Sequence, residues 1–136
     1  NQIMAIKEES VTEQKNSLAV CLDNILRHAG ITRNTEYDLA QGKTATTILS
    51  ENMTGVQVLD LSGCTLDAVL YYVNQDIPVL AILEDGEAVL VTGFNEFNVV
   101  IMEPATGKLY KKGMNDATAW FAENGNHFIT YMRTEN

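Results

Sequence analysis

Two cysteines and two histidines are the residues of this chain that could supply a thiolate nucleophile and its base. Cys21 lies inside an apolar helical pattern, so we expect a buried thiol with a raised pKa rather than a displaced nucleophile. Cys64 precedes a predicted helix, whose N-terminus would stabilise a thiolate. His28 suits the C-terminal end of the helix that holds Cys21, and His127 opens the last predicted strand. A catalytic Cys–His pair would therefore have to be assembled by the fold.

The acidic residues Glu84, Asp85, Glu87 and Glu103 form a second chemical feature. Clustered carboxylates bind calcium or a cationic peptide, but acidic residues also occupy turns, and Asp85 stands directly before a glycine. The cysteines and histidines lack the spacing of zinc ligands and are too few for a disulfide framework. We therefore predict no metal, no cofactor and two reduced thiols, with a single disulfide between them as the alternative.

The composition predicts one globular domain. The chain has 136 residues, of which 46% are hydrophobic and 20% charged. Its formal net charge of −9 at pH 7 repels phosphate backbones, which argues against nucleic acid as a partner. No apolar run approaches the ~20 residues of a membrane helix, so we expect no membrane insertion by this domain. We predict a polar lead-in over 1–13 and a single domain over 14–136, excised from a longer protein since the chain starts at Asn1.

The hydrophobic pattern predicts helices in the first half of the chain and strands in the second. The first helix has an apolar face made by Leu18, Cys21, Leu22, Ile25 and Leu26. Asn16 or Ser17 is its expected N-cap and Gly30 its C-cap. Further helices are predicted over 36–41, 45–49 and 66–75 and after Asn115 or Asp116, and strands over 56–61, 79–83, 88–94, 98–102, 108–111 and 127–133. This order favours an α+β fold with a mostly antiparallel sheet.

Smaller signals support the same elements. Thr35, Thr44 and Thr65 are the expected N-caps of three of these helices. The aromatic residues occur at helix or strand spacing, which favours core packing over a sugar- or peptide-binding shelf. These residues are Trp120, Phe121, Phe128, Tyr131, Tyr71 and Tyr72.

Three segments carry a set of motifs in a fixed order. They are Ser17-Leu18-Ala19-Val20-Cys21-Leu22 through Gly30, Asp76-Ile77-Pro78-Val79-Leu80-Ala81, and Glu87-Ala88-Val89-Leu90-Val91-Thr92-Gly93-Phe94-Asn95 with Val99-Val100-Ile101-Met102-Glu103-Pro104-Ala105-Thr106-Gly107. Together they resemble the papain-like cysteine peptidases of the bacteriocin-processing (double-glycine leader) type and their bacterial relatives. In that family a cysteine opens a helix that ends near a glycine, and a G-x-P-V turn leads into the sheet. One strand then reads H-x-V-V-V-x-G-Y, and the strand after it ends in D-P. The resemblance covers residues 11–133 and implies a papain-like fold, with a helical first half packed on a sheet from the second half.

The chain departs from the family at each catalytic position. Ser17 stands at the position of the cysteine and Leu18 at that of the glycine after it. Glu87 stands at the position of the histidine, and Glu103 at that of the aspartate. Gln14 is near the position of the family's oxyanion glutamine but closer to Ser17 than is usual. The resemblance implies that these residues lie near one another, and it leaves no catalytic residue in place.

The sequence therefore predicts a catalytically inactive, peptidase-like binding or structural module of a bacterial protein. By the resemblance, Ser17, Leu18, Glu87 and Glu103 would line a cleft that holds a peptide or partner segment. Family members include exported, membrane-attached and cytoplasmic proteins, so the compartment stays open, as does the oligomeric state. The alternative is an active cysteine peptidase or acyl-transfer enzyme that uses Cys21 or Cys64. A third reading, an engineered Cys→Ser change at Ser17, is opposed by Glu87, because a substrate-trapping variant would keep its histidine.

Overall fold

The computed structural model describes residues 16–134, which form five helices and one six-stranded sheet. The predicted lead-in over 1–13 and Gln14 lie outside the described residues. In chain order the elements are α2 (Ser17–His28), α3 (Glu36–Ala40), α4 (Ala45–Asn52), β1 (Val56–Asp60), α5 (Leu66–Val73), β2 (Val79–Ile82), β3 (Ala88–Phe94), β4 (Asn98–Met102), β5 (Leu109–Gly113), α6 (Met114–Glu123) and β6 (Phe128–Arg133).

Helix α2 begins and ends where its sequence signals predict. The Asn16 side chain accepts hydrogen bonds from the backbone N–H groups of Leu18 (2.8 Å) and Ala19 (3.3 Å), which satisfies two unpaired donors at the helix start. At the other end the chain leaves the helix through Gly30, whose φ of 88° lies in the left-handed region that glycine adopts without strain. Four residues of the apolar face between these ends, Cys21, Leu22, Ile25 and Leu26, are fully buried, so α2 is fixed against the sheet.

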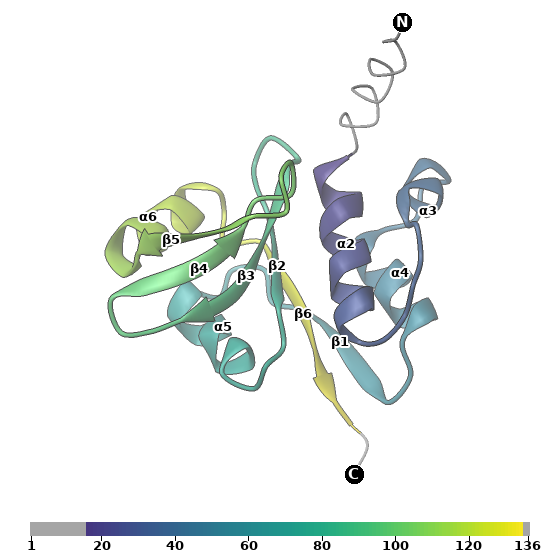
Figure 1. The fold of residues 1–136 in the computed structure, drawn as a ribbon, viewed down its shortest axis with the longest axis horizontal. Helices are drawn as coiled ribbons and strands as arrows, with labels where there is room; N and C mark the ends of the chain where they lie inside the picture. Colours follow the sequence, from purple (N-terminus) through teal and green to yellow (C-terminus); the bar gives the residue numbers. More distant parts are fainter. Residues whose placement is uncertain (1–15, 135–136) are drawn as a thin grey trace, which may run out of the picture.

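The sheet has the strand order β1-β6-β2-β3-β4-β5, and all its pairings are antiparallel within residues 16–134. Helices α2, α3 and α4 lie on one side of the sheet, and α5 and α6 lie on the other (Figure 1). Strands β1 and β5 are the two edges. The predicted α+β class is confirmed, with one addition: the sheet takes an edge strand, β1, from the first half of the chain.

Two apolar clusters fill the two faces of the sheet. On the α2 and α4 face the cluster includes Leu22, Ile25, Ile48, Leu80, Leu90 and Met102. On the α5 and α6 face it includes Leu66, Val69, Val79, Val91, Phe121 and Phe128. Because successive strand residues point to opposite faces, neighbours such as Val79 and Leu80 belong to different clusters. The central strands are thus buried on both sides, as their apolar runs predict.

The structure corrects the predicted start of α6. The helix begins at Met114, before the expected caps Asn115 and Asp116, and its N-cap Gly113 makes no side-chain cap hydrogen bond. Instead, the Met114 N–H donates to the carbonyl oxygen of Phe97 (2.7 Å), at the turn between β3 and β4. A tertiary hydrogen bond therefore satisfies the N–H of the first residue of the helix.

Of the three predicted threonine caps, two are confirmed. The hydroxyl of Thr44 accepts from the Thr47 N–H (3.2 Å), and that of Thr65 accepts from the Ala68 N–H (3.3 Å). Thr35 precedes α3 without capping it by its side chain. Its buried hydroxyl points toward α2, so the tertiary contact replaces the local one. Helix α4 also runs on to residue 52, past the predicted end at 49, and α5 ends at 73 rather than 75.

The aromatic residues pack as predicted with one exception. Phe121, Phe128 and Tyr131 are buried, and the Phe121 and Phe128 rings meet at 5.3 Å between centroids. Tyr71, by contrast, is 64% exposed and contacts the Tyr72 ring edge-on. Its position on α5 points away from the sheet, so the prediction that Tyr71 packs in the core is wrong.

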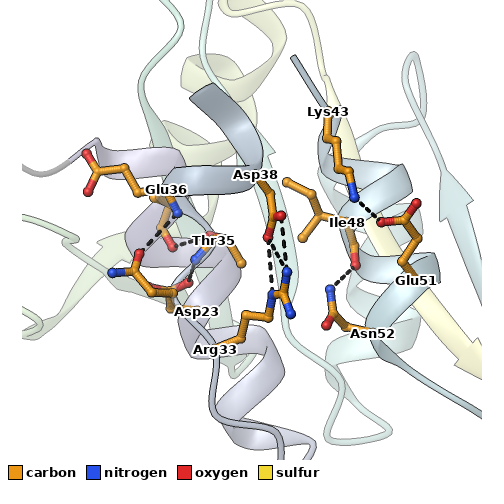
Figure 2. Close-up of polar contacts among 11 residues, drawn as sticks. Asp23, Arg33, Thr35, Glu36, Asp38, Lys43, Ile48, Glu51 and Asn52 are labelled. Carbon is orange, nitrogen blue, oxygen red and sulfur yellow. Dashed lines mark hydrogen bonds and ion pairs between the residues drawn. The ribbon is translucent and has the colours of Figure 1, made fainter. Parts of the chain in front are cut away.

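Buried polar contacts hold the segment around α3 against α2 (Figure 2). The carboxylate of Asp23, which is 7% exposed, accepts from the Thr35 N–H (2.8 Å), and the Thr35 hydroxyl donates to the Ala19 carbonyl oxygen (3.2 Å). Arg33 donates to both carboxylate oxygens of Asp38, with each N···O distance 3.1 Å. Asp38 is 4% exposed, so this two-pronged contact compensates a buried charge.

Candidate functional site

Ser17 is the first residue of α2 and contacts the start of β3. Its Oγ accepts a hydrogen bond from the Ala88 N–H at 2.9 Å. Because Ala88 directly follows Glu87, the fold places Ser17 next to the segment that carries the residue at the family's histidine position. Leu18, the next residue, is half-buried and packs on the core cluster beneath α2. The hydroxyl of Ser17 thus serves as a fixed acceptor between a helix and a strand.

Glu87 lies in the turn between β2 and β3. Its N–H donates to Asp85 Oδ1 (2.9 Å), and its carbonyl oxygen accepts from the Leu83 N–H (2.7 Å). The side chains of Glu84, Asp85 and Glu87 are all exposed in this turn. This part of the acidic set therefore has the arrangement of turn residues, with carboxylates directed to solvent or to local N–H groups.

Glu103 closes the turn between β4 and β5. Its N–H donates to the Lys108 carbonyl oxygen (2.8 Å), its carbonyl accepts from the Gly107 N–H (2.8 Å), and its carboxylate lies 3.5 Å from the Ala105 nitrogen. The side chain is half-buried, and its charge is close enough to contribute to the raised pKa of Cys21. Glu103 therefore lies near α2, and its hydrogen bonds are those of a turn.

Cys21 has the environment that its helical position predicts. The residue is fully buried among the apolar residues of α2 and the sheet, and burial raises the pKa of its thiol to about 12, with a smaller contribution from Glu103. A thiol with this pKa is protonated at neutral pH, and the thiolate is the form that attacks. Cys21 is thus a packing residue.

Cys64 lies in the loop between β1 and α5, where folding brings the segment before β6 beside it. The Gly63 N–H donates to the Asn126 carbonyl oxygen (2.9 Å), and Asn126 precedes His127. The sequence placed no histidine near Cys64, so this proximity is a product of the tertiary structure. Cys64 is half-buried and packs on the apolar cluster beneath α5 and α6, and both cysteines are free thiols, as predicted.

His28 contacts the turn before β2 rather than either cysteine. Its Nε2–H donates to the Asp76 carbonyl oxygen (3.0 Å), and the same nitrogen is 3.6 Å from the Asp76 carboxylate. Asp76 has a φ of 66°, a left-handed conformation that a residue other than glycine seldom adopts. The histidine at the end of α2 thus fixes a strained turn, in addition to facing the helix C-terminus.

A cavity of about 450 Å³ lies beside the C-terminal half of α2. Its lining includes Arg27 and His28 from α2, Leu90 and Thr92 from β3, Met102 from β4 and Leu109 from β5. Seven residues separate Ser17 from Asn24, the first lining residue on α2, which is roughly 10 Å along a helix. The cavity is therefore displaced along α2 from the predicted cleft around Ser17, Leu18, Glu87 and Glu103.

Sequence reasoning missed the residues of this cavity. The sequence pattern places Thr92 and Leu109 in strands and predicts no binding role for them or for Arg27. One available signal was the cluster of lysines around Leu109, since the stretch from Lys108 to Lys112 holds three of the nine basic residues of the chain. A basic stretch on an acidic protein marks a surface of distinct charge.

In the part of the chain that the structure describes, no group of three or more His, Cys, Asp or Glu residues is arranged to hold a metal ion. Over the same residues, 16–134, no helix combines the length and the apolar character that crossing a bilayer requires.

Comparison with solved structures relates this fold to one from Bacillus anthracis, a crystal structure described as that of a "putative C39-like peptidase". The match covers 90% of this chain and 91% of that chain, with a TM-score of 0.74 and 14% sequence identity. At that identity the likeness establishes the fold, which is papain-like. No protein-family model matches the chain, and no curated protein matches it.

Proposed function

We propose that this papain-like domain is a catalytically inactive, peptidase-like module, related to the bacteriocin-processing peptidases, that binds a peptide or partner segment without cutting it. The hydrogen bond from the Ala88 N–H to Ser17 Oγ carries the proposal. At the helix start where the family has its nucleophile, this chain has a hydroxyl that already accepts from the neighbouring strand. Glu87, beside it, supplies a carboxylate in place of an imidazole.

The chemistry of these side chains supports an inactive site. A serine hydroxyl becomes a nucleophile only with a well-placed base, and the family's base is a histidine. A carboxylate at Glu87 would oppose the negative charge that develops on the carbonyl oxygen during peptide cleavage. Glu103 makes turn hydrogen bonds, which is a structural use of the position where the family has its aspartate.

One observation favours the alternative, an enzyme that uses Cys64. The loop that holds Cys64 is hydrogen bonded to the residue before His127, so a thiol and an imidazole come from neighbouring backbone segments. Cys21 offers no such alternative, because burial raises the pKa of its thiol to about 12.

The decisive experiment for catalysis is digestion of a random peptide library followed by mass spectrometry of the products. The purified domain, the Ser17→Ala variant and the Cys64→Ala variant are compared. We expect no cleavage above the background of a heat-denatured sample from any of the three. Cleavage by the wild-type domain that disappears in Ser17→Ala would overturn the proposal, because Ser17 would then be a nucleophile.

The Cys64 alternative has its own readout. Rapid labelling of Cys64 by iodoacetamide at neutral pH would favour an enzyme if the labelling rate also rises with a midpoint pH well below that of an ordinary thiol. Loss of cleavage in Cys64→Ala would establish it. We expect slow labelling of Cys64, and labelling of Cys21 only after denaturation.

A further inference from the structure

The cavity beside α2 has an apolar base and an open rim. Leu90 and Met102 form part of its buried floor, at 3% and 6% exposure, while Leu109 is 61% exposed at its outer wall. The register of β3 on β4 shifts between Val91 and Gly93, so Thr92 is an extra residue of a β-bulge and lines the cavity. A volume of about 450 Å³ is in the range of binding pockets, which run from roughly 300 to 1,000 Å³.

The outer wall of this cavity is also an open edge of the sheet. Among residues 16–134, β5 pairs with β4 alone, and the Glu103 N–H donates to the Lys108 carbonyl oxygen (2.8 Å) at one end of that pairing. Hydrogen-bonded residues alternate along an antiparallel ladder, so Tyr110 pairs with β4. The N–H and C=O groups of Leu109 and Lys111 then face away from the sheet. An extended peptide adds to such an edge through its main chain.

The charges around the cavity select the chemistry of the peptide. Arg27 is exposed at the rim, where its guanidinium donates to Asn24 Oδ1 (2.9 Å). Lys108 and Lys111 are exposed on and beside β5, whereas Lys112 lies over the Trp120 ring on the opposite face. Arg27 thus lines the pocket, and Lys108 and Lys111 lie along the adjoining edge strand, on a chain whose net charge is −9. Asp76 also lines the pocket, and its carboxylate lies 3.6 Å from His28 Nε2.

We propose that the cavity and the free edge of β5 together bind an extended acidic peptide, which adds a strand to β5 and places an apolar side chain against Leu90, Met102 and Leu109. This inference rests on the proposed function, because it names the ligand class of a module that binds without cutting. The inference places the bound peptide at the cavity and β5, and not in the predicted cleft around Ser17 and Glu87. The open strand edge is the reason for a peptide as the occupant. Arg27 at the rim and the exposed lysines Lys108 and Lys111 along β5 are the reason for acidic residues in it.

The test begins with selection of a displayed library of random twelve-residue peptides against the whole chain. Enriched peptides are synthesised, and their affinities are measured by fluorescence anisotropy against the wild type and the variants Arg27→Glu and Leu109→Ser. Matched controls on the α3–α4 side are Lys43→Glu and Tyr37→Ser, because Lys43 is an exposed cation and Tyr37 is 69% exposed. Thermal unfolding by circular dichroism verifies that each variant is folded.

We expect enriched peptides with acidic residues flanking an apolar one, binding at least tenfold more weakly to Arg27→Glu and Leu109→Ser and normally to the controls. A second pair of variants tests strand addition. Lys111→Gln removes the charge alone, and Lys111→Pro also removes an N–H that faces outward, where an edge strand tolerates proline. Lys111→Pro is expected to bind at least tenfold more weakly than Lys111→Gln, and equal affinities would overturn the strand addition.

The outcomes separate this inference from the proposed function. Peptides that bind equally to wild type, Arg27→Glu and Leu109→Ser, but lose affinity in Ser17→Trp, would place binding in the cleft around Ser17 and overturn this inference alone. Enrichment of basic peptides would overturn the charge argument. Absence of any enriched peptide would contradict the binding function itself and this inference with it.

Discussion

Ser17 differs from a nucleophile in what its hydroxyl already contacts. Its Oγ accepts from the Ala88 N–H, a backbone donor at the start of β3 that would otherwise have to find water or another acceptor. The same logic applies to Glu103, whose backbone closes the β4–β5 turn. At the residue scale, Ser17 and Glu103 have hydrogen bonds that hold helix, strand and turn together.

This role predicts a stability cost for Ser17→Ala. The variant leaves the part-buried Ala88 N–H without its acceptor, so we expect a loss of about 1–2 kcal/mol in the free energy of unfolding. The measurement is urea denaturation followed by circular dichroism. Ser50→Ala, at an exposed position of α4, is the control and should change stability by no more than about 0.5 kcal/mol. Equal stability of the two variants would show that the Ser17 contact contributes nothing.

The raised pKa of the buried Cys21 thiol predicts that the protein loses stability at alkaline pH. Burial raises the pKa of this thiol from 9.0 to about 12, so between these pH values the unfolded chain releases a proton that the native state retains. The stabilisation present below pH 9 is then lost as the pH rises toward 12, by at most about 4 kcal/mol from this residue.

The measurement for Cys21 is the unfolding free energy at several pH values, compared between wild type and Cys21→Ala. Other groups titrate equally in both proteins, so the difference isolates the thiol. The wild type should lose stability relative to the variant above pH 9. A difference that is independent of pH would contradict the raised pKa.

At the element scale, α3 depends on polar contacts rather than on its own length. It spans only Glu36–Ala40, and an isolated helix of this size is not stable in water. The buried contact of Asp23 with Thr35 holds it against α2, and the pair of Arg33 with Asp38 joins it to the loop that precedes it (Figure 2). The nearby pair of Lys43 and Glu51 is short, at 2.7 Å, but both side chains are largely exposed.

The two ion pairs near α3 should therefore differ in their contribution. Arg33→Ala leaves the carboxylate of Asp38 buried without its cation, and we expect a loss of about 1–3 kcal/mol. Lys43→Ala removes an exposed pair and should cost less than about 1 kcal/mol. Urea denaturation of the two variants, side by side, checks the prediction, and a larger effect of Lys43→Ala would contradict it.

At the scale of the whole molecule, one sheet joins two apolar clusters. Strands β2 and β3 contribute alternate residues to both, so neither cluster can lose its packing without exposing the same strands. The papain-like arrangement of layers follows from this sharing (Figure 1). It also means that the cavity beside α2 has a rigid floor, which favours binding without large rearrangement.

The shared sheet predicts a single unfolding transition. Leu22→Ala, in the cluster beneath α2, should cost about 2–5 kcal/mol. Trp120, the single tryptophan, reports on the other cluster. We expect its fluorescence and the far-ultraviolet circular dichroism to give the same shifted midpoint in urea. A shift in circular dichroism with unchanged Trp120 fluorescence would mean that the two faces unfold separately.

The local elements and much of the fold class can be predicted from residue types and their spacing. The helical pattern of α2 with Asn16 and Gly30 at its ends, and the bounds of β3 and β4, follow from interactions within a few residues. The order of motifs also indicated a papain-like fold. The sequence alone shows that Ser17, Glu87 and Glu103 carry a hydroxyl and two carboxylates. These features depend on side-chain type and spacing, which a sequence displays directly.

The contacts between groups far apart in the chain could not be predicted in this way, because they depend on how the elements pack. Three sets of contacts join residues whose spacing in the sequence does not predict that they meet. These are the contact of Ser17 with Ala88, the approach of the Cys64 loop to the segment before His127, and the contacts of Asp23 and Asp38 with their partners. The start of α6 was missed for the same reason, because its donor is satisfied by the turn at Phe97. The cavity beside α2 required four elements to come together around Leu109 and Arg27. Its shape and charge are properties of packing, and packing is set by the whole chain.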